Sequence, residues 1–535
     1  MSSDPALRAR KKGTETQPKA GAGKANASTS SIVKARDRPS SNGNGGWSST
    51  SLLVCLAVIA CTAGFVSWQT GYIDRLLTVK KKEWTPLPGY GEDAVVDFSA
   101  DVPKRQAVVD AFKHAWLAYE RDALGADEYH PISHKGTNLS EAGGIGYTIV
   151  DSIDTMQIMG LEEEYARARL WVEEKLDFER DGRFNTFELE FRYLSMLTDE
   201  EEYWRKAEQV MKMIKGAHLT TGLASIFMNP EDGRFVLSAI RLGSRGDSYY
   251  EYLLKQYIQT NMTEPVYQAM YDDAMNGVQA HLISKSYKAG LTYTSELIPE
   301  RNSQGEISWR LAPKQDHLVC FFGGSLMLGA VTTGAVSFPV SVPPKPHELT
   351  EQGKRDWNVG RGRELVETCV KTHDTATGLS PEIVHFRISG DGLDGTLAPD
   401  DWYIKGARQG EAPPYDARYI LRYASPPTLH LPNLSSFIAF RLTGDVRYRQ
   451  QGWAIFQAIE KHCRVETGGY ASVLNVDDVP VELEDKMETF LMSETLKYLY
   501  LLFDDASTLP LSEYVFNTEA HPFPIFHPTL RTGFS

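Results

Sequence analysis

Cysteine is scarce in this sequence, with five residues among 535, and no His/Cys cluster has the spacing of a zinc site. The sequence also lacks a serine nucleophile elbow and a glycine-rich loop that could hold phosphate. Positive charge is in deficit, since 56 Lys and Arg stand against 70 Asp and Glu, a net charge of −14. This balance argues against nucleic acid as a partner, because phosphate binding needs a basic surface.

Strand-like alternation is also rare, and no motif repeats with a period of about 20–50 residues, which argues against an ordinary solenoid. Helical spacing dominates instead from about residue 102, as in the apolar series Val108, Phe112, Ala115 and Trp116. The same spacing recurs in segments 164–176, 203–217, 249–260, 264–284, 362–374 and 493–505. We therefore predict an all-α fold of repeated helix pairs over residues 101–535.

The N-terminal region differs in kind. Residues 1–50 are basic and almost free of large apolar side chains, so we expect a disordered tail. The uncharged run "LLVCLAVIACTAGFVSW" follows, and we interpret residues 51–69 as an uncleaved transmembrane signal anchor, although a buried core helix is the alternative. Residues 70–100 would form a stem. The positive-inside rule then predicts a single-pass type II protein with a cytosolic tail and a luminal domain.

A luminal domain would hold three cysteines, enough for one disulfide and one free thiol, and three sequons for N-glycosylation. The cysteines are Cys320, Cys369 and Cys463, and the sequons begin at Asn138, Asn261 and Asn433.

Several carboxylates stand at helix starts or in loops beside aromatic residues or glycines: Asp151, Asp154, Glu188, Asp247, Glu382, Glu488, Glu494 and Glu519. Each has a structural explanation of its own, for example Asp247 as a helix N-cap and Glu382 in a helix first turn. Together they suggest an acidic pocket. Such a pocket suits glycoside hydrolysis, in which one acid protonates the leaving oxygen and another activates water, and it suits Ca²⁺.

Six motifs resemble glycoside hydrolase family 47, the class I α-1,2-mannosidases that trim N-glycans in the ER and Golgi. They are "GIGYTIVDSIDTMQIMGL", "RLGSRGDSYYEYLLKQY", "PKQDHLVCFFGG", "GLSPEIVHF", "METFLMSETLKYLYLLF" and "YVFNTEAHPFP". The resemblance covers roughly residues 100–535. It implies an (α/α)₇ barrel, one Ca²⁺, an inverting mechanism on high-mannose N-glycans, and an ER or Golgi membrane location.

The resemblance also implies roles for individual residues. Glu188 resembles the proton-donating acid, and Asp247 and Glu382 resemble further catalytic carboxylates. Thr518 resembles the Ca²⁺ ligand, with Glu494 and Glu519 holding the metal's waters. Cys320 and Cys369 match the family's paired cysteines. The implied substrate-binding residues are Phe490, His317, Glu494, Asp154 and Arg245. Phe490 would form the floor under the sugar ring. For His317, a packed structural role is the alternative.

Two departures from the family pattern affect the reaction. "FNTFE" runs directly into "LEFRYL", so a segment of roughly 70 residues, long enough for a helix pair, is missing and Glu188 stands at the junction. Glu188 is either the acid or a stand-in for a downstream Gln. Second, residues 423–436 replace the family's P-E-T-x-E-S-L, whose first Glu is the general base, and no acid occurs between Asp416 and Asp445.

We therefore expect an incomplete barrel and an impaired enzyme. Two abrupt departures between intact motifs favour a retained intron and a skipped exon in the coding sequence. The alternative is a lectin-like protein that binds mannose glycans without hydrolysing them. A relationship to degradation-linked mannosidases is a third possibility, against which the Cys320 and Cys369 pair and the absence of an extra C-terminal domain both count.

Overall fold

A computed structural model describes residues 97–141, 143–177, 188–219, 221–332, 362–391, 401–406, 412–421 and 432–534. All of them belong to the compact unit Val79–Ser535. The predicted tail (1–50), the predicted anchor (51–69), most of the stem, Arg422 and residues 423–431 of the altered stretch 423–436 lie outside the described residues. Within the described part, no helix combines the length and apolar character needed to cross a membrane.

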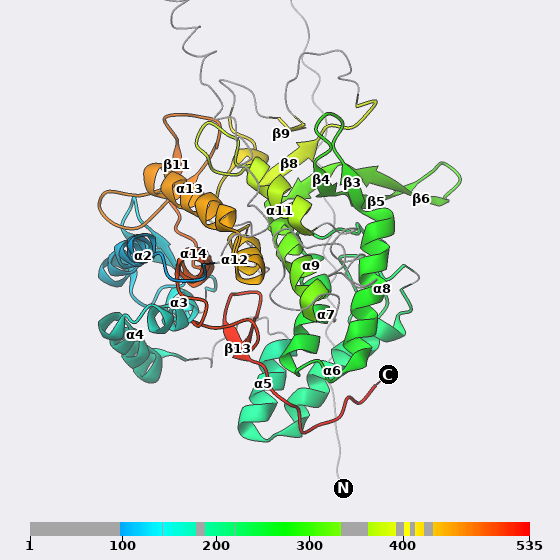
Figure 1. The fold of residues 1–535 in the computed structure, drawn as a ribbon, viewed down its shortest axis with the longest axis horizontal. Helices are drawn as coiled ribbons and strands as arrows, with labels where there is room; N and C mark the ends of the chain where they lie inside the picture. Colours follow the sequence, from blue (N-terminus) through cyan, green and yellow to red (C-terminus); the bar gives the residue numbers. More distant parts are fainter. Residues whose placement is uncertain are drawn as a thin grey trace, which may run out of the picture. The chain divides into compact units, whose positions relative to one another are not determined.

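Helices dominate the described residues, as predicted (Figure 1). The α-helices are α2 (Val102–Ala123), α3 (Tyr147–Ile158), α4 (Glu162–Lys175), α5 (Glu188–Thr198), α6 (Glu201–Gly216), α7 (Asp247–Gln259), α8 (Pro265–His281), α9 (Phe321–Thr332), α11 (Gly362–Lys371), α12 (Pro432–Thr443), α13 (Val446–His462) and α14 (Leu496–Phe503). Short 3₁₀ turns cover His317–Cys320 (η1) and Tyr415–Ala417 (η4), and a π-helical turn, η5 (Leu491–Thr495), leads into α14.

Helix α2 shows how the sequence specifies these elements. Asp101 caps its N-terminus by accepting a hydrogen bond from the Lys104 N–H, and Pro103 occupies the first turn, where a proline costs nothing. Its buried stripe includes Val108, Phe112 and Trp116, the series that the helical spacing predicts. The amphipathic pattern therefore fixes both the helix and the face that it buries.

The helices pack as an inner row covered by outer partners. Along the inner row α5, α7, α9, α12 and α14 are successive neighbours, and η5 joins α14 to α3. Each inner helix has an outer partner: α4 covers α3, α6 covers α5, α8 covers α7, α11 covers α9, α13 covers α12, and α2 covers α14. The described residues thus form six helix pairs.

The row does not close between α3 and α5. Within the described residues, neither α3 nor α4 packs against α5 or α6 to a comparable extent (Figure 1). Only residues 178–187 separate the described ends of these two pairs in the sequence, too few for a further pair of helices of average length, about 11–12 residues each. The expected loss of one helix pair at Glu188 matches this break.

Short antiparallel strands connect the helices, and the rarity of alternation in the sequence does not predict them. The described residues contain thirteen: β1 (Glu128–His130), β2 (Lys135–Thr137), β3 (Ile283–Lys285), β4 (Thr292–Thr294), β5 (Glu296–Arg301), β6 (Ile307–Ala312), β7 (Lys314–Asp316), β8 (Ile383–Phe386), β9 (Trp402–Tyr403), β10 (Ser472–Val473), β11 (Leu483–Glu484), β12 (Tyr514–Phe516) and β13 (Pro522–Pro524). Most have only two or three residues, too short to show alternation.

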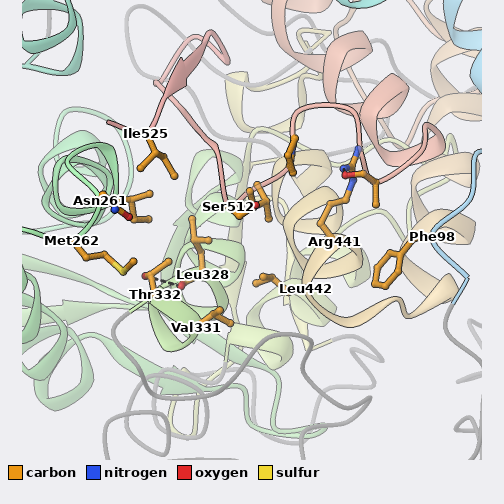
Figure 2. Close-up of a pocket in the computed structure, with 14 residues that line it drawn as sticks. Phe98, Asn261, Met262, Leu328, Val331, Thr332, Arg441, Leu442, Ser512 and Ile525 are labelled. Carbon is orange, nitrogen blue, oxygen red and sulfur yellow. Dashed lines mark hydrogen bonds between the residues drawn. The ribbon is translucent and has the colours of Figure 1, made fainter. Parts of the chain in front are cut away.

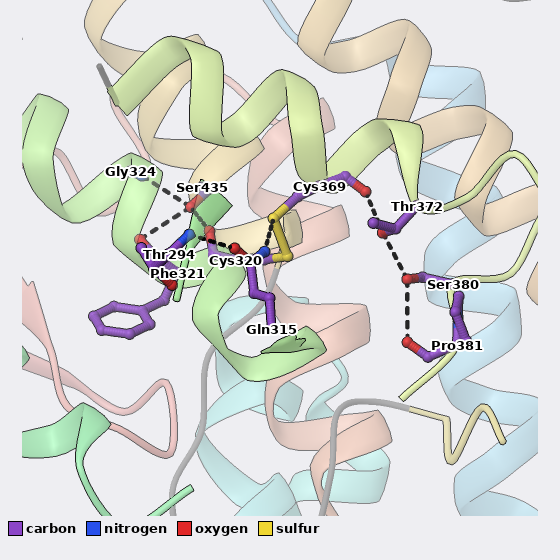
Figure 3. The surroundings of a disulfide bond; sticks show 10 residues. All are labelled: Thr294, Gln315, Cys320, Phe321, Gly324, Cys369, Thr372, Ser380, Pro381 and Ser435. Atoms are coloured by element: carbon purple, nitrogen blue, oxygen red, sulfur yellow. Dashed lines mark hydrogen bonds between the residues drawn. A yellow bond between two sulfur atoms is a disulfide. The ribbon is translucent and has the colours of Figure 1, made fainter. Parts of the chain in front are cut away.

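The disulfide between Cys320 and Cys369 is confirmed, and Cys463 is a buried free thiol (Figure 3). The bridge joins the start of α9 to α11 across 49 residues, which the loop-entropy model converts to about 4 kcal/mol. Ser435 lies beside it in α12, where its Oγ donates to the Cys320 carbonyl and accepts from the Gly324 N–H at 2.9 Å. The altered stretch therefore rejoins the packed fold at Ser435.

Candidate active site

Thr518 lies in the turn between β12 and β13, the hairpin nearest the C-terminus, and is almost fully buried. Asn517 fixes the turn, because its Oδ1 accepts from the N–H groups of Glu519 at 2.9 Å and His521 at 2.8 Å. Its Nδ2 donates to Glu190 Oε1 at 2.6 Å. The hydroxyls of Thr518 and Tyr252 lie 3.5 Å apart. This turn is the centre of the site.

Helix α7 brings a row of charged side chains to the same turn. Asp247, Glu251 and Lys255 follow at intervals of four, so they share one helix face. Lys255 donates to Glu251 and, at 3.2 Å, to the Asn517 carbonyl. Burial raises the pKa of Glu251 to about 7, and the nearby Asp247 carboxylate also favours the protonated form.

Asp247 is not the N-cap of α7, which is Gly246; Asp247 is the first helical residue, and its Oδ1 accepts from the Ser248 N–H at 2.8 Å. The interpretation of Asp247 as a cap is wrong, although the helix dipole favours a carboxylate at this position. Glu382 is likewise not in a helix, because it immediately precedes strand β8. For both residues, the structural explanation offered from the sequence fails.

Helix α3 contributes two further acids. Asp154 Oδ2 accepts from Lys497 Nζ at 2.7 Å and lies 3.0 Å from His521 Nδ1. Burial alone would raise the pKa of Asp154, but the charges of Lys497 and His521 lower it to about 2. Burial alone would lower the pKa of His521, and Asp154 and Asp151 raise it to about 10 instead. Asp154 and His521 are therefore both charged at neutral pH.

The π-helical turn η5 carries Glu494, which is buried. Burial raises the pKa of the Tyr147 phenol far above its ordinary value, and the carboxylates of Asp151, Glu519 and Glu494 raise it further. These three acids consequently face the same phenol. π-helical turns are rare and often lie at functional sites.

We call Asp151, Asp154, Glu190, Asp247, Glu251, Glu494 and Glu519 the acidic cluster. Three cations contact it, namely Lys255, Lys497 and His521, so negative charge remains in excess among these residues. The structure brings together the predicted residues Thr518, Asp247, Asp154, Glu494 and Glu519.

Glu382, His317 and Phe490 form a second group, continuous with the first. The His317 N–H donates to the Glu382 carbonyl at 2.9 Å, and both residues are buried. Phe490 packs against Leu318 and Ile420 and directly precedes η5. Phe490 thus connects this group along the chain to η5, which carries Glu494 of the acidic cluster.

Two further predicted residues lie outside the contacts described so far. Arg245 is exposed, and its guanidinium lies 5.2 Å from the ring centroid of Phe227. Glu188 begins α5, but its side chain lies outside what the structure describes. Its neighbour two residues on, Glu190, is the acid that reaches the Thr518 turn.

The sequence analysis did not assign Glu190, Glu251, Lys255 or His521. The sequence does carry a signal for Glu251 and Lys255. They follow Asp247 at i, i+4 spacing, which places these charged side chains on one helix face. Glu190 and His521 carry no such local signal, because they meet only through Asn517 and the fold.

The donors around Thr518 are chemically suited to a hard cation, because they are carboxylate, hydroxyl and carbonyl oxygens. Glu190 Oε2 is buried and has no hydrogen-bond partner among the described residues, so an acceptor remains unused there. No group of three or more His, Cys, Asp or Glu in the described ranges is close enough to hold a metal by itself. A cation here would need Thr518 and water as ligands, with the acids outside them.

The apolar cavity in Figure 2 is a separate feature with a volume of about 440 Å³. Ile258, at the end of α7, and Leu328 and Thr332, at the end of α9, line it. Along α7, Ile258 lies roughly 16 Å from Asp247 and roughly 10 Å from Glu251, the two acids that this helix contributes to the acidic cluster. The cavity is distinct from the acidic site.

Comparison with known proteins shows which families of sequence and fold this chain resembles. The family model described as Glycosyl hydrolase family 47 matches residues 111–189 and 181–525, two segments that overlap where the break in the helix row occurs. A Candida albicans mannosyl-oligosaccharide 1,2-alpha-mannosidase is 37% identical, covering 82% of this chain and 87% of that protein. This alignment is 530 positions long, whereas the part of this chain that it covers is only 82% of 535 residues. The alignment therefore includes positions that this chain lacks.

Two further proteins are similar. A human endoplasmic reticulum mannosyl-oligosaccharide 1,2-alpha-mannosidase is 35% identical, covering 79% of this chain and 64% of that protein. The solved structure of an alpha-1,2-mannosidase from Trichoderma reesei superposes with a TM-score of 0.64 at 22% identity, covering 80% of this chain and all of that one. The latter likeness concerns the fold, a helical barrel.

Proposed function

The chain belongs to glycosyl hydrolase family 47, and from this premise we propose that it acts on terminal α-1,2-linked mannose of high-mannose N-glycans. The observation that carries the proposal is the match of the family across both sides of the helix break, together with relatives named as mannosyl-oligosaccharide 1,2-alpha-mannosidases. The acidic cluster supports it, because glycoside hydrolysis needs paired carboxylates.

Within this proposal the residues have separate tasks. Glu188 protonates the leaving oxygen, and Asp247 and Glu382 are the further acids of the pocket. Phe490 supports the apolar face of the sugar ring, since its own ring packs on Leu318 and Ile420 and is held in place. Inversion would release mannose in the β configuration, because water attacks from the face opposite the leaving group.

We also propose that Thr518 holds Ca²⁺ through its hydroxyl and main-chain oxygens, with Glu494 and Glu519 binding the metal's waters. The excess negative charge of the acidic cluster and the unpaired Glu190 Oε2 favour a cation at this turn. When bound, Ca²⁺ would supply positive charge that orients sugar hydroxyls. Asn517 and Lys255 hold the Thr518 turn in position for it.

The setting proposed for this activity is the ER or Golgi lumen, with residues 51–69 as a type II membrane anchor. The uncharged apolar run after a basic tail supports the anchor. The confirmed disulfide is of the kind that persists in an oxidising compartment, and a human relative is named as an endoplasmic reticulum enzyme.

A second function has a specific observation in its favour. The stretch 423–436 contains no carboxylate, and the family's water-activating Glu belongs there. Loss of a general base costs about 10²–10⁴-fold in rate. The chain as written would then bind mannose glycans with little hydrolysis, as a lectin-like protein.

One experiment separates the two functions. The purified full chain is incubated with Man₉GlcNAc₂ in Ca²⁺, and both glycan binding and mannose release are measured. We expect binding that EGTA abolishes, with slow release of β-mannose. Normal turnover would contradict impairment of this chain, and absence of any binding would contradict both functions.

A matched variant tests the cause of the slow turnover. Replacing residues 423–436 with Pro-Glu-Thr-Ala-Glu-Ser-Leu restores the acids, and turnover should rise by about 10²–10⁴-fold while glycan affinity changes little. A variant with Gln in place of both Glu residues of the insert controls for the shorter loop. Equal turnover of the two inserts would show that the missing base is not the cause.

A further inference from the structure

An exposed aromatic side chain stands beside the Glu382 group. Tyr415 in η4 is 45% exposed, and the Arg418 guanidinium lies 5.6 Å from its ring centroid. Arg418 Nη1 in turn donates to both carboxylate oxygens of Glu484, at 2.9 and 3.0 Å. Arg418, held by its ion pair with Glu484, therefore holds the Tyr415 ring in place.

A second exposed ring continues this surface. Asp416, next to Tyr415, lies 3.2 Å from His385 Nε2, and the His385 ring stacks on Tyr403 with centroids 5.6 Å apart. Tyr403 is 40% exposed and pairs with His385 across strands β8 and β9 (Figure 1). We call Tyr415, Arg418, Glu484, Asp416, His385 and Tyr403 the Tyr415 patch.

The backbone connects the Tyr415 patch to the candidate active site. The Arg418 carbonyl accepts the Glu382 N–H at 2.9 Å. Ile420, two residues after Arg418, contacts Phe490, and alternate residues of an extended segment point to the same side. Arg418 of the patch therefore lies two residues, roughly 7 Å along the extended segment, from Ile420, which contacts the ring proposed as the sugar floor.

The chemistry of the Tyr415 patch fits a neutral sugar. Tyr provides a rigid, amphipathic contact surface at low entropic cost, and the apolar C–H face of a pyranose can pack on it. Arg418 is paired with Glu484, and His385, whose pKa burial lowers, is hydrogen-bonded to Asp416, so the patch offers hydrogen-bonding groups without an unpaired positive charge for a phosphate. A ring already immobilised loses little further freedom on binding.

We propose that the Tyr415 patch binds a mannose residue of the same high-mannose glycan other than the one held over Phe490. This inference rests on the proposed function. The patch adds affinity for a branched glycan and adds nothing for a disaccharide that fills only the Phe490 pocket. It is thus a determinant of substrate size.

Equilibrium binding to the full chain in Ca²⁺ tests the proposal, with Man₉GlcNAc₂ and methyl α-1,2-mannobioside as the two probes. Tyr415→Ala should weaken binding of Man₉GlcNAc₂ about 5- to 10-fold and leave the mannobioside within about 2-fold. Tyr415→Phe should keep the affinity for both, because the ring makes the contact. Trp309→Ala is the matched control, since Trp309 is 40% exposed on the β5–β6 hairpin, outside the patch.

The outcomes are distinct. Equal loss for both probes would mean that Tyr415→Ala distorts the Glu382 group, and no loss for either would mean that the ring does not contact glycan; each result overturns the proposal. A loss confined to Man₉GlcNAc₂ in Tyr415→Ala, absent in Trp309→Ala, supports it. If the unmodified chain binds neither probe, the proposed function fails and the inference fails with it.

Discussion

The backbone N–H of His317 donates to the carbonyl oxygen of Glu382 over 2.9 Å, so two residues 65 positions apart in the sequence are direct neighbours. The register of β7 and β8 produces this contact, because Asp316 pairs with Ile383 and the next residues outward are His317 and Glu382. A three-stranded sheet therefore positions part of the site in a protein that the sequence predicts as all-α.

The first prediction concerns Ca²⁺ at Thr518. Thr518→Val removes a hydroxyl ligand with little change in volume. In the unmodified chain, Ca²⁺ at about 100 times its Kd should add about 2.7 kcal/mol to the free energy of unfolding, and the variant should lose most of this response. Urea unfolding with Ca²⁺ or with EGTA measures the difference.

The control is Thr443→Val, which removes another buried hydroxyl. Thr443 Oγ1 donates to the Ala439 carbonyl within its own helix at 2.6 Å, far from the acidic cluster in sequence. This variant should keep the full Ca²⁺ response. A Thr518→Val protein that Ca²⁺ stabilises as much as the parent would refute Thr518 as a ligand.

The second prediction concerns pH and His373. Burial lowers the pKa of His373 to about 4, although the Gly378 carbonyl, 3.0 Å from Nδ1, opposes the shift. Its Nε2 is buried and has no hydrogen-bond partner in the described part of the chain, so protonation would create a buried, unpaired N–H. The neutral ring is therefore the form that the fold accepts.

The sign of the effect follows from proton binding. Between pH 6.5 and about 4 the unfolded chain binds more protons at this position, so the contribution of His373 is complete above pH 6.5 and is lost as pH falls. At about pH 5 the loss is about 2 kcal/mol. Between about pH 7.5 and pH 5, the free energy of unfolding of the His373→Asn variant should fall by about 2 kcal/mol less than that of the parent protein, as measured by urea unfolding. Identical pH dependence of both proteins would contradict the assignment.

Much of the architecture could be predicted from the sequence because amphipathic helices carry their own pattern. The segments 164–176, 203–217 and 249–260 correspond to α4, α6 and α7 within three residues at each end. The disulfide partners also emerged correctly, although only from the family resemblance. Amphipathic helices therefore leave a local signal that can be read without knowledge of the fold, whereas the cysteine pairing needed the resemblance.

The site itself was less predictable because its contacts are long-range. Glu190 and His521 belong to α5 and the β12–β13 hairpin, and Asn517 hydrogen-bonds to both. Within the altered stretch, Pro432 is the first residue of α12, where a missing N–H costs no hydrogen bond. The hairpin contacts α3 through Asp154 and α5 through Glu190, on both sides of the break.

The third prediction concerns a buried ion pair at the edge of the helix row. Arg192 in α5 is fully buried, pairs with Glu264, and lies 4.1 Å from the Trp204 ring centroid. Arg192→Met should destabilise the chain by about 3–5 kcal/mol, because Glu264 would remain buried without its partner. The double variant Arg192→Met with Glu264→Gln should recover much of the loss. A single variant as stable as the parent would show that the pair does not anchor α5.

The fourth prediction concerns the open side of the helix row. On α5, Leu189 is buried and Arg192 faces the core, whereas Leu194 and Leu197 lie three residues apart on another face and are 36% and 62% exposed. If no helix pair covers this face, polar substitutions there remove exposed apolar surface at almost no cost. Leu194→Lys combined with Leu197→Glu should change the free energy of unfolding by no more than about 0.5 kcal/mol per site and should reduce aggregation and dye binding.

The same two substitutions would act in the opposite direction in a closed barrel, because a helix pair inserted between α4 and α5 would bury this face and a buried charge is costly. Leu189→Glu provides the reference for a covered position, since Leu189 is fully buried and its replacement should unfold the protein. A loss of several kcal/mol from Leu194→Lys with Leu197→Glu would therefore mean that the face is covered and the row closed. Sequencing transcripts across residues 185–192 and 420–440 gives an independent answer. Recovery of the family's missing helix and of R-P-E-T-x-E-S would make the open row a property of this chain alone. A clean read of the present sequence would refute the retained intron and skipped exon.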